Sequence, residues 1–486
     1  MNHQHIKRHS GYTFLVLSTV LSLLPSIIFS QQFVGLPSTD YSAIHQVPLN
    51  PAWVNSSDNG TEFMAFSFSA LAGTNAYQFK RKWVLDGFNG KAREGKDYFA
   101  NTSRRMKHMW ANFDIMGPAV SFKYKEEHHI GVYTRMRQLY RGGNFSSSQL
   151  GLFGDNTPAV YYDQDVNFKK AGFSVHNFSE IGFSYGRILR NDEYHIVRAG
   201  VTVKYLMGFV AGSVYTNELT YRRDNKDTAA AITGDITALY TYNATSYLDN
   251  DASNDFSQWF QRAGKAGLGL DIGVQYEYHP NGTPNEETPY LYSIAASITD
   301  IGGIGYVADR GSNNYTLTAS NVVINNLSLK DYEGLDQYMD RQVKDSLITA
   351  KGTVEKFRMG LPTAFRVNTD WNLSPQFNIG VNVLLNMKGN GGDIYRPAYV
   401  NYFNITPTYG NRKYSISAPF SLIGYQNLCI GAAFRYGPFY IGSSSLLSSM
   451  IVKNISSIDA YAGLVFKFKK TYNYYTGEGR YNRFRP

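Results

Sequence analysis

Charged side chains recur at every second position in several segments of this sequence, and that spacing determines which chemistry they could perform. Arg135 and Arg137 are two residues apart, and Asp271 and Glu277 are also an even number of residues apart. Side chains at even spacing lie on one face of a β-strand. A ring of Arg or Lys in a pore selects anions, and Arg binds a carboxylate through two parallel hydrogen bonds. The candidates for a lumen or ligand path are Arg135, Arg137, Arg198, Lys204, Arg366, Arg435, Asp271 and Glu277.

The predicted inner faces carry more bases than acids, which favours an anionic solute. A structural reading stays open beside it, in which inward Arg side chains pair with acids on neighbouring strands and stiffen the wall. A register error of one residue would also move a side chain to the other face. The inward bases are Lys123, Arg135, Arg137, Arg141, Arg198, Lys204, Arg366, Arg435, Lys467 and Lys469, and the inward acids are Asp271, Glu277 and Asp370.

Other patterns that could bind phosphate or a metal are incomplete. Residues 90–96 have the spacing of a phosphate-binding loop, but Asp97 stands where that loop needs Ser or Thr. Asp163, Asp165 and Asn167 have the alternate spacing of a calcium loop without its Gly and its distal Glu. The same holds for Asp249, Asp251 and Asp255. We therefore predict no metal site and no cofactor.

The histidines give no sign of an active site. Catalysis by a barrel needs a nucleophile, a base and an orienting group close together. His128, His129, His195 and His279 fall in or beside short turns, and the other histidines have no recognisable Ser or Asp partner motif. We therefore predict that the protein is not an enzyme.

The segments that must position these residues alternate apolar and polar residues, as in Ala266–Tyr278 and Phe377–Asn386. Their connections switch between short and long, and a soluble β-sandwich does not confine long loops to one end. The fold class is therefore all-β, a transmembrane antiparallel β-barrel of about fourteen strands with long extracellular loops. The predicted strands are 61–71, 113–124, 129–141, 178–188, 196–207, 265–278, 289–299, 359–371, 376–387, 398–408, 414–425, 428–436, 438–446 and 458–469.

The short connections belong on the periplasmic side and the long ones outside the cell. The extracellular loops would be 72–112, 142–176, 207–265 and 302–358. Segments 208–224 and 235–248 are also strand-like, so the strand count could differ by two. Within the last loop, Ser328–Lys344 has apolar residues at helical spacing.

The chain divides into four parts. Residues 1–30 have the basic start and apolar stretch of a cleaved secretory signal peptide, which places the protein in the cell outer membrane. Residues 31–60 form an N-terminal plug segment, 61–470 the barrel, and 471–486 a basic, aromatic periplasmic tail. The formal charge of +9 becomes +7 once Lys7 and Arg8 are removed with the signal peptide.

Short motifs resemble known outer-membrane families. Leu49-Asn50-Pro51-Ala52 resembles an element ahead of the first strand in the long-chain fatty acid transporter superfamily, where it belongs to a hatch in a fourteen-stranded barrel. The resemblance implies that Asn50, Pro51 and Ala52 are part of a plug. Met116–Ala119, Gly182–Arg187, Gly267–Glu277, Asp300–Gly302 and Tyr436–Ser443 resemble an uncharacterised Bacteroidota outer-membrane family, a domain of unknown function. That family is distantly similar to fatty acid transporters and to PorP/SprF barrels.

Two functions are consistent with this sequence. The first is passive transport of a small hydrophobic or amphipathic solute, with an anion as one candidate. The second is a structural or assembly role in a secretion, gliding-motility or surface-protein complex. The basic balance suits outer-membrane lipid and lipopolysaccharide better than nucleic acid in an exported protein.

Overall fold

The computed structural model of this chain describes residues 43–55, 60–85, 93, 95–125, 127–147, 149, 162–225, 228–247, 261–281, 290–323, 335–387, 396–411, 413–424, 427–468, 470–472 and 479–481. Among these residues no helix is long and apolar enough to cross a membrane. The predicted signal peptide and the acidic group at Asp249, Asp251 and Asp255 lie outside the described residues.

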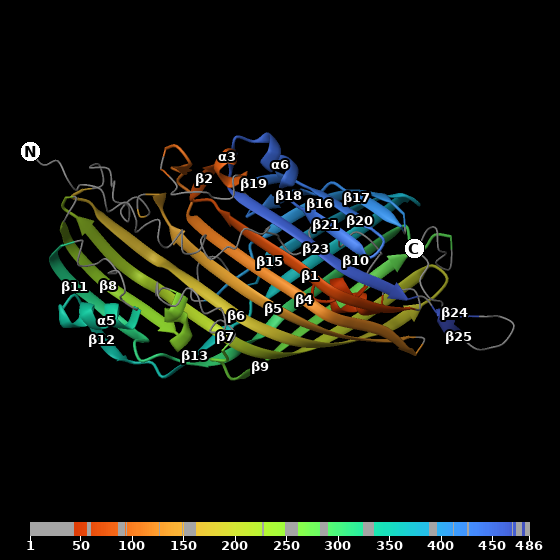
Figure 1. The fold of residues 1–486 in the computed structure, drawn as a ribbon, viewed down its shortest axis with the longest axis horizontal. Helices are drawn as coiled ribbons and strands as arrows, with labels where there is room; N and C mark the ends of the chain where they lie inside the picture. The colour runs from red at the N-terminus through yellow and green to blue at the C-terminus, as the bar shows by residue number, and fades with distance from the viewer. Residues whose placement is uncertain are drawn as a thin grey trace, which may run out of the picture.

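The described strands close into a barrel, as predicted from the alternation. Fourteen antiparallel strands surround the lumen, and β1 pairs with β23 from Thr61↔Phe468 to Gly73↔Ser457. The wall is shown in Figure 1. In order around the barrel, its strands are β1 (Thr61–Thr74), β4 (Lys107–Lys125), β5 (His128–Phe145), β6 (Asp165–Asn191), β7 (His195–Arg223), β9 (Ala266–Tyr278), β10 (Tyr292–Val307), β13 (Lys356–Gly360) with β14 (Ala364–Ser374), β15 (Phe377–Asn386), β16 (Tyr402–Gly410), β17 (Tyr414–Ser417) with β18 (Phe420–Ile423), β19 (Asn427–Ile430) with β20 (Ala432–Tyr436), β21 (Phe439–Ser443) and β23 (Ser457–Phe468).

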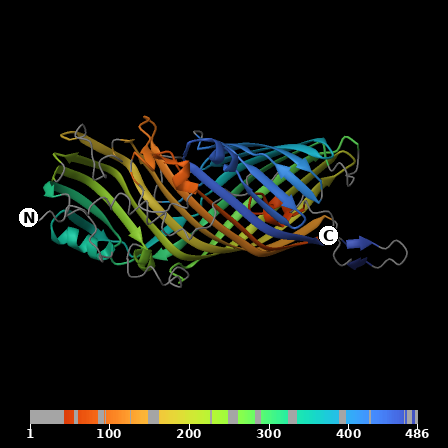
Figure 2. The same ribbon diagram turned by 45° about the horizontal axis from the view of Figure 1, so that its top comes forward.

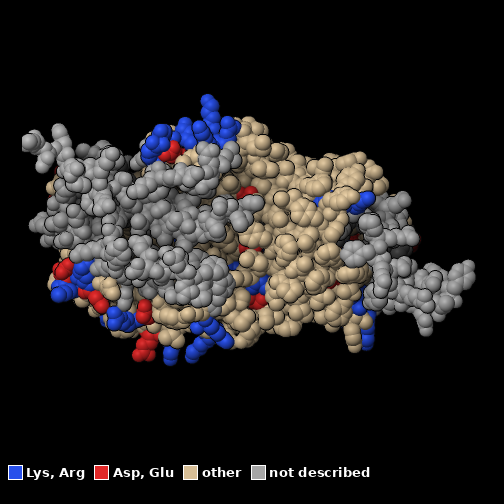
Figure 3. Space-filling model, in the orientation of Figure 1, with Lys and Arg blue, Asp and Glu red and all other residues tan. Residues whose placement is uncertain are grey.

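The two faces of the wall differ in polarity. In β9, Leu270, Ile272 and Val274 are exposed on the outside, whereas Asp271 and Glu277 are buried inside. The same period of two runs through the other long strands, so the outer surface is mainly apolar, and it forms the broad tan area of Figure 3. An apolar outer band with a polar interior is the arrangement of a barrel in lipid.

The end of the barrel with the short turns carries a cluster of aromatic side chains. Tyr276, Tyr278 and Tyr292 pack against one another, and the Tyr276 hydroxyl lies 2.8 Å from Nδ1 of His195. Such aromatic residues suit the interface between lipid and water. A small hairpin of β24 (Lys470–Tyr472) and β25 (Gly479–Tyr481) extends from this end (Figure 1).

At the opposite end, segments within the predicted loops 142–176, 207–265 and 302–358 form a sheet. The strand-like segments 208–224 and 235–248 indicated part of it, whereas the strands at 313–323 and 348–353 were not predicted. β6 and β7 continue past the barrel for a total of 27 and 29 residues. They are joined by β8 (Thr228–Tyr240), β11 (Asn313–Val323) and β12 (Ile348–Thr353), with 3-10 helix η3 (Tyr242–Tyr247) and helix α5 (Leu335–Lys344) beside them. The strands form here because one face buries an apolar layer, whose members include Ile232, Tyr240, Tyr315, Leu317 and Ile348.

A second, smaller sheet lies outside the barrel wall. It contains β2 (Tyr77–Lys80), β3 (Tyr98–Ala100) and β22 (Asn454–Ile455), with α3 (Arg81–Leu85) and α6 (Leu446–Ile451) beside it. Trp83 and Val84 pack with Ile455 and with Ile458 of β23. Ile458 alternates with the buried Ser457 and Asp459, so the sheet rests on the outward face of the wall.

A short N-terminal segment lies inside the barrel. It comprises α2 (Ala43–Gln46) and the 3-10 helix η1 (Pro51–Asn55), and we call residues 43–55 the inner segment. Figures 1 and 2 both show it, in red, within the wall near the end that carries the short turns.

The polarity of the wall gives the first testable prediction. Ile272→Arg places a charge on the lipid-facing side of β9 and should lower the free energy of unfolding by about 2–4 kcal/mol. Thr318→Arg, on an exposed face of β11 beyond the barrel, should change it by less than about 0.5 kcal/mol. Urea unfolding in phospholipid vesicles measures both values. Equal effects would mean that Ile272 does not face lipid.

Candidate functional site

Asn50 and Pro51 determine the local structure of the inner segment. The Asn50 side-chain oxygen accepts a hydrogen bond from the Ala52 backbone N–H at 2.9 Å, as a helix N-cap does. Pro51 occupies the first helical position, where a missing N–H costs nothing. The Asn50 amide donates to the carbonyls of Val274, at 3.2 Å, and Ala296, at 3.3 Å. One side chain thus starts η1 and fixes it to β9 and β10.

Glycines in the wall provide the space for this segment. A Cβ on Gly273 would lie 2.0 Å from the Asn50 side-chain oxygen, and a Cβ on Gly200 would lie 2.3 Å from the Pro51 carbonyl. Real Cβ atoms do not approach other atoms so closely, and at Gly200 the obstacle is backbone. Only glycine therefore allows η1 to lie against β7 and β9.

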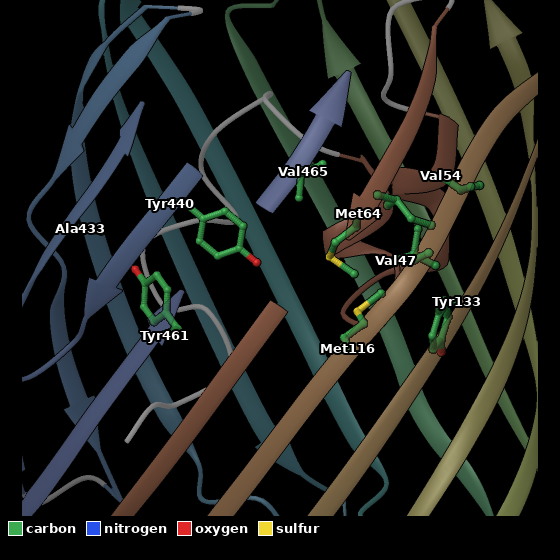
Figure 4. Packing of buried hydrophobic residues seen from close by; sticks show 11 residues of the cluster. Val47, Val54, Met64, Met116, Tyr133, Ala433, Tyr440, Tyr461 and Val465 are labelled. Atoms are coloured by element: carbon green, nitrogen blue, oxygen red, sulfur yellow. The ribbon is translucent and has the colours of Figure 1, made fainter. Parts of the chain in front are cut away.

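Apolar packing holds the other side of the inner segment. Val47 and Val54 belong to one buried cluster with Met64, Met116 and Tyr133 of the wall (Figure 4). The same view shows Tyr440 and Tyr461 projecting into the lumen from β21 and β23. Burial of side chains of this size typically stabilises a structure by about 1.5–3 kcal/mol each.

Two further polar contacts join the inner segment to the barrel. The Ile44 backbone N–H donates to the buried Glu62 carboxylate at 2.9 Å, and Lys467 lies 3.5 Å from the other Glu62 oxygen. Ser297 donates its hydroxyl to the Leu49 carbonyl at 2.6 Å. The polar attachment thus depends on a few side chains from β1 and β10.

On the side of the inner segment away from the short turns, a network of buried ion pairs lies within the lumen. We call Asp114, Arg135, Arg137, Glu180, Lys204, Asp271 and Asp300 the lumen network. Its members come from β4, β5, β6, β7, β9 and β10. It therefore links six strands that follow one another around one part of the wall.

Arg137 is the branch point of the lumen network. Its guanidinium binds both Asp300 carboxylate oxygens, at 2.8 and 3.1 Å, and reaches Glu180 at 3.3 Å. It also donates to the hydroxyl of Tyr399, which itself donates to Asp300 at 3.0 Å. Two-point Arg–carboxylate contacts are strong and directional. Asp300 and Arg137 are therefore held in one geometry.

The remaining members surround this branch point. Arg135 donates to both oxygens of Asp114, at 2.8 and 2.9 Å, and to Glu180 at 3.3 Å. Lys204 lies 2.7 Å from Asp271 and 2.8 Å from Asp300. Each basic group thus has at least two acidic partners, as buried charges require.

An apolar layer lies next to the lumen network, on the side away from the short turns. Leu139 follows Arg137 by two residues, Leu206 follows Lys204 by two, and both strands run outward. Ile304, Tyr306, Met359 and Leu361 complete the same buried cluster together with Phe178 and Ala211. From the outside inward, the lumen therefore presents apolar groups, then ion pairs, then the inner segment.

The opposite wall, from β15 to β18, is polar and carries no charged side chain. Asn382 donates to Asn404 at 3.2 Å, and Asn404 donates to the Ser421 hydroxyl at 3.0 Å. Thr408 and Ser417 continue the row with a contact of 2.8 Å. The ionic groups are therefore concentrated on one side of the lumen.

The structure brings together some of the predicted lumen residues and separates others. Arg135, Arg137, Lys204 and Asp271 belong to the lumen network. Arg198 pairs with Glu277 near the short turns, where Gln275 and His279 also contact Glu277. Arg366 lies 5.3 Å from the ring of Tyr399, which itself contacts Arg137 and Asp300. Arg435 binds the Asn411 carbonyl at 2.6 Å, apart from the network. Their role in a ligand path stays a prediction.

The predicted excess of inward bases, ten against three acids, is smaller in the structure. Five further acids are buried, and ion pairs join Arg135, Arg137 and Lys204 to acids of other strands, as in the structural reading that the sequence left open. Glu180 stands opposite Arg135 in the strand register, so alternation could have found it. Asp300 could not be found in this way, because a bulge places it beside the equally buried Thr299. The additional acids are Glu62, Asp114, Glu180, Asp300 and Asp459.

No cluster of His, Cys, Asp or Glu that could hold a metal ion occurs in the part of the chain that the structure describes. Asp163 and Asp165 are both exposed, and Asp163 lies 3.9 Å from Arg222 rather than facing a group of acids. The described side chains of the lumen form packing contacts, hydrogen bonds and ion pairs.

Comparisons with known proteins identify the family. The model described as "Family of unknown function (DUF5723)" matches residues 51–444, so the chain belongs to that family. This confirms the resemblance to an uncharacterised family of barrels. No curated protein matches the chain.

Several solved outer-membrane structures are similar to the chain. The toluene transporter TbuX of Ralstonia pickettii has 10% identity and a TM-score of 0.38, with 87% of this chain and 93% of that chain covered. The toluene transporter TodX of P. putida has 7% identity and a TM-score of 0.39, with 92% and 100% covered. A Pseudomonas aeruginosa FadL homologue has 9% identity and a TM-score of 0.30, with 90% and 96% covered.

The close approach at Gly200 gives a test of how the inner segment is held. Gly200→Val should push η1 away from β7, so that a cysteine introduced as Ala52→Cys becomes accessible to a maleimide in a Cys429→Ser background. Without the Val substitution the same cysteine should stay unlabelled, because Ala52 is buried. Gly305→Val is the matched control, since its Cβ would meet no atom within 4 Å. Labelling that is equally slow in all three proteins would contradict the close packing.

The lumen network gives a second test. Arg137→Ala removes the partner of Asp300 and Glu180 and should lower the free energy of unfolding by about 3–5 kcal/mol. Arg187→Ala removes an exposed partner of Glu127 at 3.5 Å and should cost less than about 1 kcal/mol. Urea titration followed by tryptophan fluorescence compares them. If both variants unfold at the same urea concentration, the network does not stabilise the barrel.

Proposed function

We propose that this chain is an outer-membrane barrel for the passive transport of a small hydrophobic or, more specifically, amphipathic molecule. Its inner segment acts as a plug in this proposal. The observation that carries the proposal is the order of layers in the lumen, where the apolar cluster of Leu139, Leu206 and Ile304 adjoins the lumen network. The inner segment lies beyond both layers, towards the end with the short turns.

The layers suit a molecule with an apolar chain and a polar head. The chain would replace water over the apolar layer, which is favourable in proportion to the apolar area buried. The polar head would contact Arg137 and Lys204, which are cationic hydrogen-bond donors, and Asp300, which is an anionic acceptor. The network is close to electrically balanced, so it supports an amphipathic solute without a preference for anions.

The inner segment supports control of passage. It fills the lumen through apolar contacts and a few hydrogen bonds, among them those of Asn50 and Ser297. Passage requires that this segment shift or that the solute move past it. Neither step breaks a strand pair of the wall, because the inner segment pairs with none of its strands.

Export and orientation complete the proposal. Residues 1–30 serve as the signal peptide, and residues 471–486 form a tail on the periplasmic side. The β24–β25 hairpin within that tail extends from the end with the short turns, which supports this orientation (Figure 1).

Uptake by liposomes tests the transport function. Vesicles that contain the protein should take up a fluorescent long-chain fatty acid faster than empty vesicles. Leu206→Asp should slow this uptake at least several-fold, because it places a charge in the apolar layer. Thr318→Asp, on the exposed face of β11, is the matched control and should transport as the unaltered protein does. Uptake equal to that of empty vesicles would refute the proposal.

A second candidate function is assembly with other surface proteins. The extracellular sheet of β6, β7, β8, β11 and β12 favours it, because β12 pairs through one edge only among the described strands and residues 349–353 are exposed. Unpaired strand edges are common sites of protein docking. Purification from native membranes in mild detergent distinguishes the two functions, and recovery of the barrel alone would count against assembly.

A further inference from the structure

The outer surface formed by β2, α3, β22 and α6 carries features that the transport proposal does not use. It lies outside the wall, at the rim where β1 and β23 end towards the extracellular side. Figure 1 shows α3 and α6 side by side there, and contacts between Arg81 and residues 450 and 453 join them. We call this surface the rim platform.

Helix α6 has its polar and apolar sides reversed relative to a helix in water. Its buried side holds Ser449, while Leu446, Met450 and Ile451 are 48%, 58% and 74% exposed. The turn before it is fixed to the wall by Asp459, which accepts hydrogen bonds from the Ser443 hydroxyl at 3.1 Å and the Ser444 N–H at 2.6 Å. A soluble protein rarely exposes such a cluster of large apolar side chains, whereas lipid chains cover it without cost.

Basic side chains border this apolar helix. Lys80, Arg81 and Lys82 follow one another, and the Arg81 backbone N–H donates to the Lys453 carbonyl at 3.0 Å. The Arg81 guanidinium also donates to the Met450 carbonyl in the last turn of α6. Figure 3 shows Lys and Arg gathered at the edge of the molecule above β2 and α3. The basic groups and the apolar helix therefore form one continuous surface.

Few acids oppose these bases. The described elements of the rim platform contain no acid, and Asp97, just before β3, pairs with Arg93 at 3.1 Å. No described carboxylate forms an ion pair with Arg81, Lys82 or Lys453. By contrast, at the other end of the barrel Arg187 pairs with Glu127 and Arg190 pairs with Asp192. The rim platform thus has cationic groups available for an external anion.

We propose that the rim platform binds the phosphorylated glycolipid of the outer leaflet, the lipid A part of lipopolysaccharide. Its phosphates would contact Arg81, Lys82 and Lys453, since Arg and Lys are the usual phosphate partners. Its acyl chains would cover Leu446, Met450 and Ile451 and continue over the apolar outer wall. This inference rests on the proposed placement of the barrel in the outer membrane, with the rim platform at the outer leaflet.

Native mass spectrometry after purification in mild detergent tests the proposal. The protein should retain added lipid A. The triple variant Arg81→Ala/Lys82→Ala/Lys453→Ala should bind it with an affinity at least about tenfold lower. The matched control is Arg187→Ala/Arg190→Ala/Lys413→Ala at the other end of the barrel, which should retain lipid A as the unaltered protein does. Because Arg81 supports α6, the pair Lys82→Ala/Lys453→Ala provides a second variant that leaves this contact intact and should also weaken retention.

Two further ligands identify the recognised chemistry. Lipid A without phosphates should be lost, and phosphatidylglycerol should be retained more weakly than lipid A. Equal retention of phosphatidylglycerol, or unchanged retention in both variants, would overturn the proposal. The triple variant should still accelerate fatty acid uptake, because the rim platform lies outside the lumen. A failure of transport and a failure of lipid A binding are therefore distinguishable.

Discussion

The bond between Arg137 and Asp300 is the contact on which the interior of this barrel depends. Arg137 stands on β5 and Asp300 on β10, so the ion pair joins strands that are not neighbours in the wall. Through shared partners it connects to Glu180 and Lys204. Buried charges tolerate such a position only when each is paired and hydrogen-bonded. The requirement fixes the relative positions of the strands that supply a partner.

The inner segment depends on a different constraint, the absence of side chains. Gly200 and Gly273 leave room for η1. The Asn50 amide donates hydrogen bonds to two wall carbonyls, and these bonds replace hydrogen bonds to water that the buried groups lose. A backbone group buried without a partner costs about as much as a lost hydrogen bond. The Asn-Pro-Ala sequence therefore has a local explanation in helix capping and close packing, in addition to any part it plays in transport.

The sequence was sufficient for the barrel and for most inward positions, because the period of two extends through every long strand of the wall. It predicted fourteen strands, and the structure has fourteen in its described part. It failed in two places. The sheet beyond the barrel was predicted only in part, through the strand-like segments 208–224 and 235–248, and β11 and β12 were placed in a loop. Asp300 was not predicted to face inward because the bulge after Ile298 breaks the alternation of its strand. Its partners lie on β5 and β7, so the sequence of β10 alone does not indicate the ion pairs.

The balanced charge of the lumen network bears on which solute can cross it. A purely apolar molecule that separates Arg137 from Asp300 forms no hydrogen bond with either side chain. Both charges would then be buried without this partner, which is strongly unfavourable. A simple anion can bind Arg137, but it has no contact with the apolar layer at Leu139 and Leu206 and it repels Asp300 and Glu180. A molecule with both an apolar chain and a polar head can use the two layers in succession, since its head replaces the hydrogen bonds that it breaks. If the barrel transports solutes as we propose, the arrangement of the layers therefore favours amphipathic solutes over hydrocarbons and over small anions.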